Sequence, residues 1–159
     1  MKIGVIADTH SLDIPKEVLE AFKGVDLIIH AGDFCSLKDA EVLKKIKELK
    51  AVHGNMDDHE VRKEFPIRQV IDCAGVKIGL AHGHGASSHA LAFVRKEFEK
   101  DKVDAVIFGH SHQPMNETID GVLYFNPGSP NDKVHAPYNS YGLLEIKDGN
   151  VKAKIIKLK

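Results

Sequence analysis

The chain has 159 residues, of which 43% are hydrophobic, so its length and composition predict one globular domain over residues 1–159 with a sizeable core. Its 22 Lys and Arg residues balance 23 Asp and Glu residues, and a net charge of -1 gives no general reason to expect binding to nucleic acid or to a membrane. The N-terminal apolar run stops at Asp8, and no run approaches the ~18 apolar residues of a membrane span, so we expect a cytoplasmic protein.

The first half of the chain predicts alternating strands and helices. Residues 2–7 suit a buried strand, a helix over about 15–22 follows with Pro15 in its first turn, and residues 25–29 suit a second strand. A second helix begins at Ser36 or Leu37 and turns its lysines outward, which is typical of a solvated face rather than a nucleic-acid patch. Its predicted inward residues are Ala40, Val42, Leu43, Ile46 and Leu49. A third strand at 51–54 completes an order that predicts right-handed crossovers and a parallel sheet.

The second half predicts mostly strands. Residues 67–73 and 76–81 flank Ala74-Gly75 and suit a hairpin, and a helix over about 87–99 comes next. The predicted apolar face of that helix consists of Ala90, Leu91, Phe93, Val94 and Phe98. Further strands are expected at 103–108, 117–119, 122–125, 141–146 and 151–158, with Asp120-Gly121 and Asp148-Gly149 as hairpin turns. Two sheets packed face to face, with helices outside, accommodate this order.

Polar side chains recur where the predicted strands end, and ligands collect at the ends of buried strands. In chain order they are Asp8, His10, Asp33, Asn55, His82, His110 and His112. Carboxylate, imidazole and amide oxygen together suit Mn, Fe, Zn or Ni, while the lack of cysteine among them argues against a structural zinc. Seven ligands exceed the needs of one ion. They would serve two ions roughly 3.5–4 Å apart if one carboxylate bridged them, an arrangement that activates water for attack at phosphorus.

The motifs that carry these residues are Asp8-x-His10, Gly32-Asp33, Gly54-Asn55, His82 and Gly109-His110-x-His112. Together they resemble the ligand signature of the calcineurin-like metallophosphoesterases, and the resemblance covers essentially the whole chain. The small size, His82-Gly83-His84 and Asn126-Pro127-Gly128-Ser129 resemble the compact bacterial and archaeal phosphodiesterase branch in particular.

The resemblance implies an α/β fold, a four-layer αββα sandwich of two mixed sheets flanked by helices. It also implies two divalent metal ions per chain, with Mn expected first and Ni, Fe or Zn as alternatives. One ion is assigned to Asp8, His10, Asp33 and His112, and the other to Asp33, Asn55, His82 and His110. Asp33 is therefore the expected bridge. Relatives of this kind often form homodimers or homotetramers.

The chain departs from the wider family after Gly54-Asn55. Many members place a histidine next, which meets the substrate and is a proposed proton donor, whereas this chain has Met56. A thioether donates no proton, so a factor of about 10²–10⁴ must come from another group or be forgone. His84 is the candidate substitute, with a supporting or packing role as the alternative. Asn55 is the second candidate catalytic residue, because its NH₂ group can donate to a substrate oxygen.

Several other polar residues receive structural interpretations. His30 and His53 lie inside apolar runs and suit core or supporting positions, while His59, His89 and His135 suit the surface. Asn126-Pro127-Gly128-Ser129-Pro130 predicts either a tight turn or a segment that touches phosphate. Cys35 and Cys73 form no CxxC pair, which favours two reduced thiols.

These features predict a metal-dependent phosphodiesterase in which a hydroxide bridging two ions attacks a small phosphodiester. Two ions, two aspartates and the hydroxide leave a charge of about +1, which matches a diester monoanion better than a monoester dianion. One alternative is a broad phosphomonoesterase or nuclease. Another is a non-catalytic protein-interaction scaffold, as in the retromer subunit of the same fold, whose ligand positions are altered. Asp33 and Asn55 are retained here, which favours the enzyme.

Overall fold

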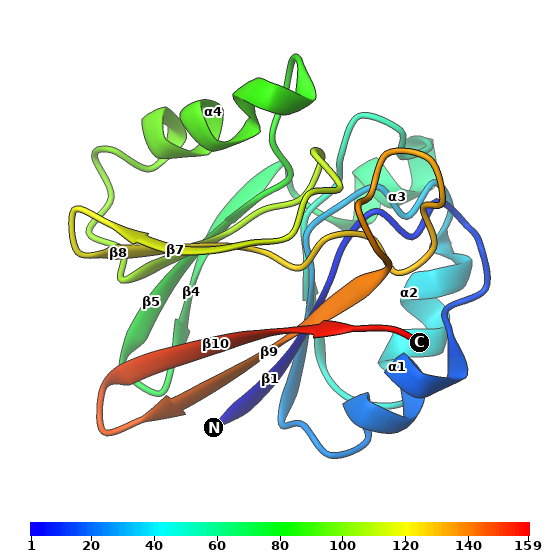
Figure 1. Ribbon diagram of the computed structural model, residues 1–159, viewed down its shortest axis with the longest axis horizontal. Coiled ribbons are helices and arrows are strands. Elements are labelled where there is room, and N and C mark those ends of the chain that lie inside the picture. The colour runs from blue at the N-terminus through cyan, green and yellow to red at the C-terminus, as the bar shows by residue number, and fades with distance from the viewer.

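The computed structural model describes residues 1–159 and contains two five-stranded sheets (Figure 1). The first sheet has the strand order β10-β9-β1-β2-β3. Its strands are β1 (Lys2–Ile6), β2 (Leu27–His30), β3 (Leu49–Ala51), β9 (Ser140–Lys147) and β10 (Asn150–Lys157). β1, β2 and β3 are parallel, as predicted, because a crossover helix joins each to the next. β9 pairs antiparallel with both β1 and β10, which makes the sheet mixed.

The second sheet has the order β4-β5-β6-β8-β7. Its strands are β4 (Arg68–Cys73), β5 (Val76–Ala81), β6 (Ala105–Ile107), β7 (Met115–Ile119) and β8 (Val122–Asn126). β5, β6 and β8 run parallel, while β4 and β7 pair antiparallel with their hairpin partners. Ala74, Asp120 and Asp148 have φ values of 52°, 51° and 52°, and a glycine with positive φ follows each. The three predicted hairpin turns are thus confirmed in a conformation that matches strand twist.

Apolar side chains hold the layers together. The inner faces of the two sheets share a core of 17 buried residues, which includes Val5, Ile29, Ile78 and Phe125. Helices α1 (Lys16–Phe22) and α2 (Leu37–Lys44) cover the outer face of the first sheet with a second cluster. Helix α4 (Ala90–Glu97), preceded by a 3₁₀ turn (Ser87–His89), covers the second sheet. This arrangement confirms the four-layer αββα sandwich.

Three details differ from the sequence-based expectations. The second helix stops at Lys44, and Leu49 opens β3 instead of facing inward from the helix, because Leu49 pairs with Ile28 in the sheet. Helix α3 (His59–Glu64) was not predicted, since its six residues carry no apolar periodicity and only Val61 is buried. Phe93 lies on α4 as expected, but its side chain is exposed rather than part of the apolar face.

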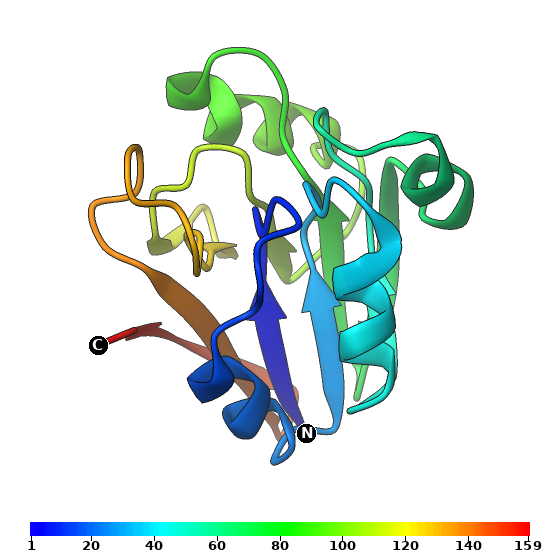
Figure 2. The same cartoon turned by 90° about the vertical axis from the view of Figure 1, so that its right-hand side faces the viewer.

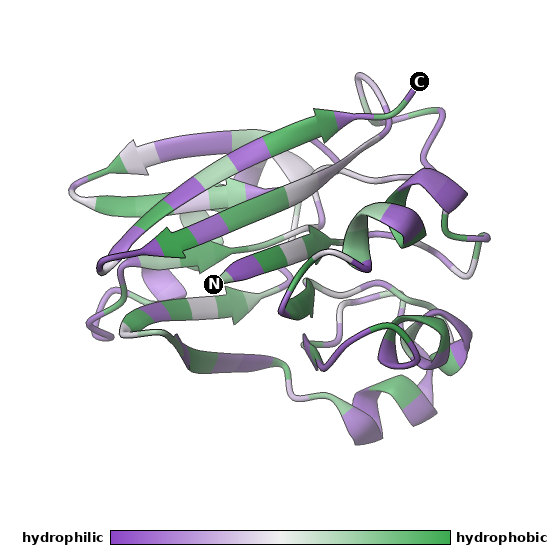
Figure 3. Cartoon of the chain, turned by 90° about the horizontal axis from the view of Figure 1, so that it is seen from below, coloured by the Kyte–Doolittle hydropathy of each residue, from purple (hydrophilic) through white to green (hydrophobic).

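The carboxyl ends of β1 and β2 point to one edge of the molecule, where the loops that follow them gather (Figure 2). β10, the outermost strand of the first sheet, alternates hydrophilic and hydrophobic residues along most of its length (Figure 3). No helix has the length and apolar character needed to cross a membrane. The fold therefore concentrates its polar strand ends at a single edge, and the candidate site lies there.

Candidate metal centre

The backbone at this edge is unusual in conformation. Five expected ligands have a positive φ, a left-handed region that residues other than glycine enter only at some cost. They are Asp8 (56°), His10 (53°), Asp33 (59°), His110 (67°) and His112 (56°). Backbone hydrogen bonds hold these turns: Asp8 N donates to Gly32 O at 3.0 Å, and His10 N donates to Asp33 O at 3.0 Å. Each turn directs its side chain back toward the strand ends instead of into solvent.

Asp8, His10 and His112 form a first group whose ligand atoms all lie within 4.8 Å of one another. The Nε2 atoms of the two histidines are 3.2 Å apart, and His112 Nε2 is 3.3 Å from Asp8 Oδ1. The other ring nitrogen of His112, Nδ1, is hydrogen-bonded to Asp132. Burial disfavours the charged imidazole, but Asp8 and Asp132 outweigh it and raise the pKa of His112 to about 9. The carboxylates of Asp8 and Asp132 therefore stabilise a positive charge at this group.

Asp8, Asp33 and His82 form a second group, and all three are buried. His82 Nδ1 donates to Ala31 O at 2.7 Å, which leaves Nε2 as the free ring nitrogen. Nε2 lies 3.1 Å from Asp33 Oδ2 and 3.8 Å from Asp8 Oδ1, yet it makes no hydrogen bond. Burial lowers the pKa of His82, and the carboxylates reverse that effect and raise it. The carboxylates thus favour a positive charge at Nε2, and once the proton is displaced the nitrogen and the two carboxylates fit a divalent cation between them.

Asn55 and His110 lie at the rim of these groups. His110 Nδ1 is 3.0 Å from Asn55 Oδ1, and His110 Nε2 is 2.7 Å from Gly85 O. The structure therefore brings five of the seven expected ligands into two groups and pairs the other two with each other. The carboxylate common to both groups is Asp8. The assignment of Asp33 as the bridge stays a prediction.

Two adjoining hollows open onto the centre, and Asn55 lines both; a further hollow of about 620 Å³ touches only His110 and His112 among the expected ligands. The first, of about 660 Å³, lies beside the 131–135 loop and reaches His10 and His112; we call it the loop-side hollow. The second, of about 400 Å³, is bordered by α3 and α4 and reaches His82; we call it the helix-side hollow. His84 lines the helix-side hollow and Met56 the loop-side one. A substrate can thus approach the candidate ligands from two sides.

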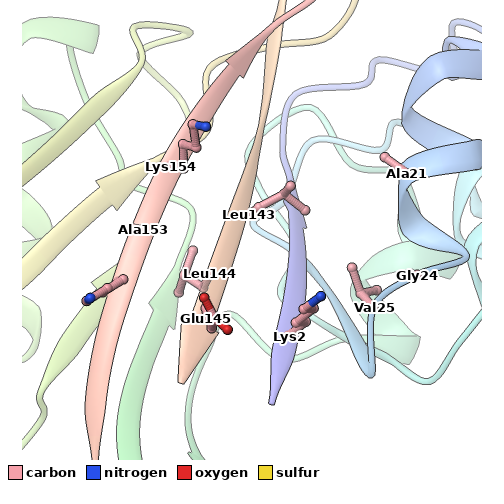
Figure 4. A pocket seen from close by; sticks show the side chains of 10 residues that line it. Lys2, Ala21, Gly24, Val25, Leu143, Leu144, Glu145, Ala153 and Lys154 are labelled. Carbon is pink, nitrogen blue, oxygen red and sulfur yellow. The ribbon is translucent and has the colours of Figure 1, made fainter. Parts of the chain in front are cut away.

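Another hollow lies between α1 and the β9–β10 hairpin and has a volume of about 590 Å³ (Figure 4). Its lining includes Lys2, Val25, Leu143 and Lys154, and none of the expected ligands. It shares no lining residue with the loop-side or the helix-side hollow.

Residues 1–149 match the family described as the calcineurin-like phosphoesterase superfamily domain. The chain belongs to this superfamily. The predicted resemblance is therefore confirmed.

Similar proteins include two that are named as phosphoesterases and one named Vps29. A probable metallophosphoesterase of Methanocaldococcus jannaschii is 34% identical over 163 residues, which cover 99% of this chain and 82% of the relative. A phosphodiesterase of the same organism is 32% identical over 146 residues, covering 80% of this chain and 83% of that protein. The structure of Vps29 from Entamoeba histolytica complexed with Zn²⁺ has a TM-score of 0.75 and 28% identity, with 99% of each chain covered.

Asp57 is a supporting residue of this calcineurin-like site that sequence reasoning missed. Its buried carboxylate accepts from Asp33 N at 3.0 Å, from Gly54 N at 2.6 Å and from Cys35 N at 2.7 Å. These bonds tie the loop after β2 to the loop after β3, which carry two expected ligands. The sequence signal was only its place two residues after Asn55, and the adjacent Asp58 caps α3 instead.

A second support comes from the segment after β8. Asn126 is fully buried and donates to Gly109 O at 2.9 Å, while Ser129 Oγ donates to Asp8 O at 2.8 Å. Asn126 Oδ1 also accepts from Gly128 N, so the segment is a tight turn that braces the backbone of the metal loops. The alternative in which Asn126 touches phosphate is wrong, because its side chain is enclosed by these partners.

Close packing explains the glycine before Asn55. A Cβ atom at Gly54 would lie 2.6 Å from His82 Cδ2 and would also overlap the Asp33 carboxylate. Only a glycine lets this strand end approach the second ligand group.

The remaining histidines behave as predicted. His30 is buried between Thr9 Oγ1 at 3.1 Å and Gly32 N at 3.1 Å, and burial holds its pKa well below the ordinary value. It is therefore a neutral supporting residue. His53 is half-buried, while His59, His89 and His135 are exposed. His135 borders the loop-side hollow.

We predict that Asp57→Asn lowers the free energy of unfolding by roughly 2–4 kcal/mol, because an amide replaces a carboxylate that accepts three buried backbone bonds. Asp58→Asn is the matched control: it removes the same charge one residue away and keeps a good helix cap, so it should cost less than about 0.5 kcal/mol. Urea unfolding of the metal-free proteins measures both changes. Equal stabilities of the two variants would contradict the bracing role of Asp57.

Proposed function

We propose that this calcineurin-like protein is a metal-dependent phosphodiesterase that uses two divalent ions, with manganese expected first. The ligands proposed for the ions are Asp8, His10, Asp33, Asn55, His82, His110 and His112. When bound, the pair would supply a shared hydroxide nucleophile and positive charge for the phosphoryl oxygens.

The observation that carries this proposal is the orientation of three imidazole nitrogens. His10 Nε2 and His112 Nε2 face each other beside Asp8, and His82 Nε2 faces Asp33 and Asp8 without a hydrogen bond. Imidazole nitrogens and carboxylates directed at common points bind a cation, which is a proton in the metal-free protein, as the raised pKa values of His82 and His112 indicate, or a metal ion that displaces it. Names of relatives support phosphoester hydrolysis, and one of them is a phosphodiesterase.

The charges around the centre support a diester substrate. Asp57 adds a negative charge to the count of about +1, because the neutral backbone amides that donate to its carboxylate do not cancel that charge. Asp132 adds another, since its contact with His112 holds the pKa of Asp132 below the usual range despite partial burial. The sum then falls to about -1, which disfavours a dianion more strongly than a monoanion.

The residues at the rim have separable roles. Asn55 would hold an ion through its carbonyl oxygen and turn its NH₂ group to a phosphoryl oxygen. His84 is exposed on the wall of the helix-side hollow, where it can hold a proton for the departing oxygen. As water oxygen bonds to phosphorus, the bond to one ester oxygen breaks, and that oxygen takes the proton.

The rival function is a protein-interaction scaffold, and the similarity to Vps29 is the observation that favours it. Because the Vps29 structure contains Zn²⁺, metal binding alone does not separate the two functions, and turnover of a phosphodiester decides between them.

We predict that Asp33→Asn abolishes turnover of bis(4-nitrophenyl) phosphate, with a loss of at least about 10³-fold, because it removes a charged ligand and weakens metal binding. His84→Asn should lose about tenfold at most, since 4-nitrophenolate departs with little help from an acid. Steady-state kinetics with metal analysis of both proteins is the measurement. Comparable losses at unchanged metal content would mean that the centre is misassigned.

Met56 generates a second prediction. Its side chain is exposed in the loop-side hollow and offers no proton, so activated aryl diesters should be cleaved far faster than alkyl diesters. Met56→His should raise rates by about 10²-fold for poor leaving groups and by little for good ones. Met56→Gln is the control of similar size without a titrating proton. Rates plotted against leaving-group pKa decide the matter, and the same slope in all three proteins would show that another group already protonates the leaving oxygen.

A further inference from the structure

Large hydrophobic side chains that remain exposed are concentrated around the metal centre. The chain has seven of them, and five line the two hollows that open onto the candidate ligands. These five are Leu12, Met56 and Val134 in the loop-side hollow, and Ile67 and Phe93 in the helix-side hollow. Val134 is 81% exposed and Ile67 is 68% exposed, so neither contributes much to the core. Apolar side chains gathered in this way mark a binding surface rather than chance exposure.

The two groups of apolar side chains lie on different elements on either side of the strand ends. Figure 2 shows the 131–138 loop, in orange, to the left of these strand ends and α3 to the right. Asn55 lines both hollows and so marks the point where they meet. A phosphorus atom held at that point would direct its two ester oxygens into different hollows, because the bonds of a tetrahedral phosphate diverge.

The helix-side hollow suits a flat apolar group. The rings of Phe93 and His84 have centroids 5.9 Å apart and form one wall with Ile67. The rest of the lining contains imidazoles and Arg62 but no carboxylate. Arg62 already donates hydrogen bonds to the backbone carbonyl oxygens of Asp57 and Asn55. A wall of this kind provides stacking and apolar contact near a negatively charged phosphate.

The loop-side hollow has a different lining. Leu12, Met56 and Val134 provide apolar contact there, with Lys133 and His135 as polar neighbours. Its volume of about 660 Å³ lies within the range of small-molecule sites and exceeds what one phosphoryl oxygen needs. A monoester, with a single organic arm, would leave one of the two apolar walls without a partner.

We propose that the substrate is a phosphodiester with an apolar or aromatic group on each of its two ester oxygens, an aromatic one in the helix-side hollow and the other in the loop-side hollow. This inference rests on the proposed function for the position of phosphorus. The proposal predicts that diesters with small, polar ester groups are poor substrates.

Binding of three phosphodiester monoanions to the manganese-loaded protein tests the proposal. Dimethyl, methyl phenyl and diphenyl phosphate carry the same charge and differ only in their arms. Calorimetry should give affinities that rise by about tenfold for each phenyl group, because each buries additional apolar area. Release of phenol is followed in the same samples to report hydrolysis.

Three variants separate the hollows. Phe93→Ala and Val134→Ala should each weaken diphenyl phosphate about tenfold and leave dimethyl phosphate unchanged, and the double variant should bind both alike. Ile67→Ala serves as a second test of the helix side. Val70→Ala is the matched control, since Val70 is an exposed hydrophobic residue that lines neither hollow, and it should change nothing.

Affinities that agree within threefold for the three anions would overturn the inference, and a docking surface for a protein would give that result. Equal effects of Val70→Ala and Phe93→Ala would overturn it as well. If the affinities rise as predicted but no diester is hydrolysed with any divalent metal, the preference for two apolar ester groups is supported and the catalytic proposal fails. If diesters are hydrolysed with no preference for their arms, only this inference fails.

Discussion

The candidate centre depends on one buried carboxylate that is not among its expected ligands. Asp57 accepts backbone hydrogen bonds from Asp33, Cys35 and Gly54, and these residues come from the loops after two neighbouring strands. Backbone N–H groups in a buried loop need acceptors, and a charged acceptor satisfies three of them at once. Because those loops are fixed to each other, Asp33 reaches His82 and the rim residue Asn55 stays beside His110.

A second constraint is electrostatic. Burying Asp8 and Asp33 against histidine nitrogens costs free energy unless positive charge accompanies them. The left-handed backbone conformation at five expected ligands adds a further cost in free energy. Strained backbone and buried polar groups that occur together are typical of functional sites. The apolar side chains around the centre can bind the organic groups of a substrate. Stability elsewhere comes from the core between the sheets.

Much of this arrangement could be predicted from the sequence, because continuous apolar runs that end in Asp or His give both the strands and the edge where ligands collect. The sandwich, its hairpins and its parallel segment followed from those patterns. The short helix α3 did not, since six residues with one buried side chain leave no periodicity. Asp57 and Asp132 were missed as supports because polar residues in loops look solvated until the loop conformation is known. The extent of the domain, residues 1–159, stays a prediction.

The number of metal ions per chain tests the account most directly. Elemental analysis of folded protein, loaded with manganese and freed of excess metal, should give two ions per chain. Asp33→Asn should lose both, since Asp33 is the expected bridge between the two ions. His10→Ala should retain one, since His10 belongs to the first group alone. A reproducible content of one ion or none in the unaltered protein, with folding verified by circular dichroism, would contradict the dinuclear centre.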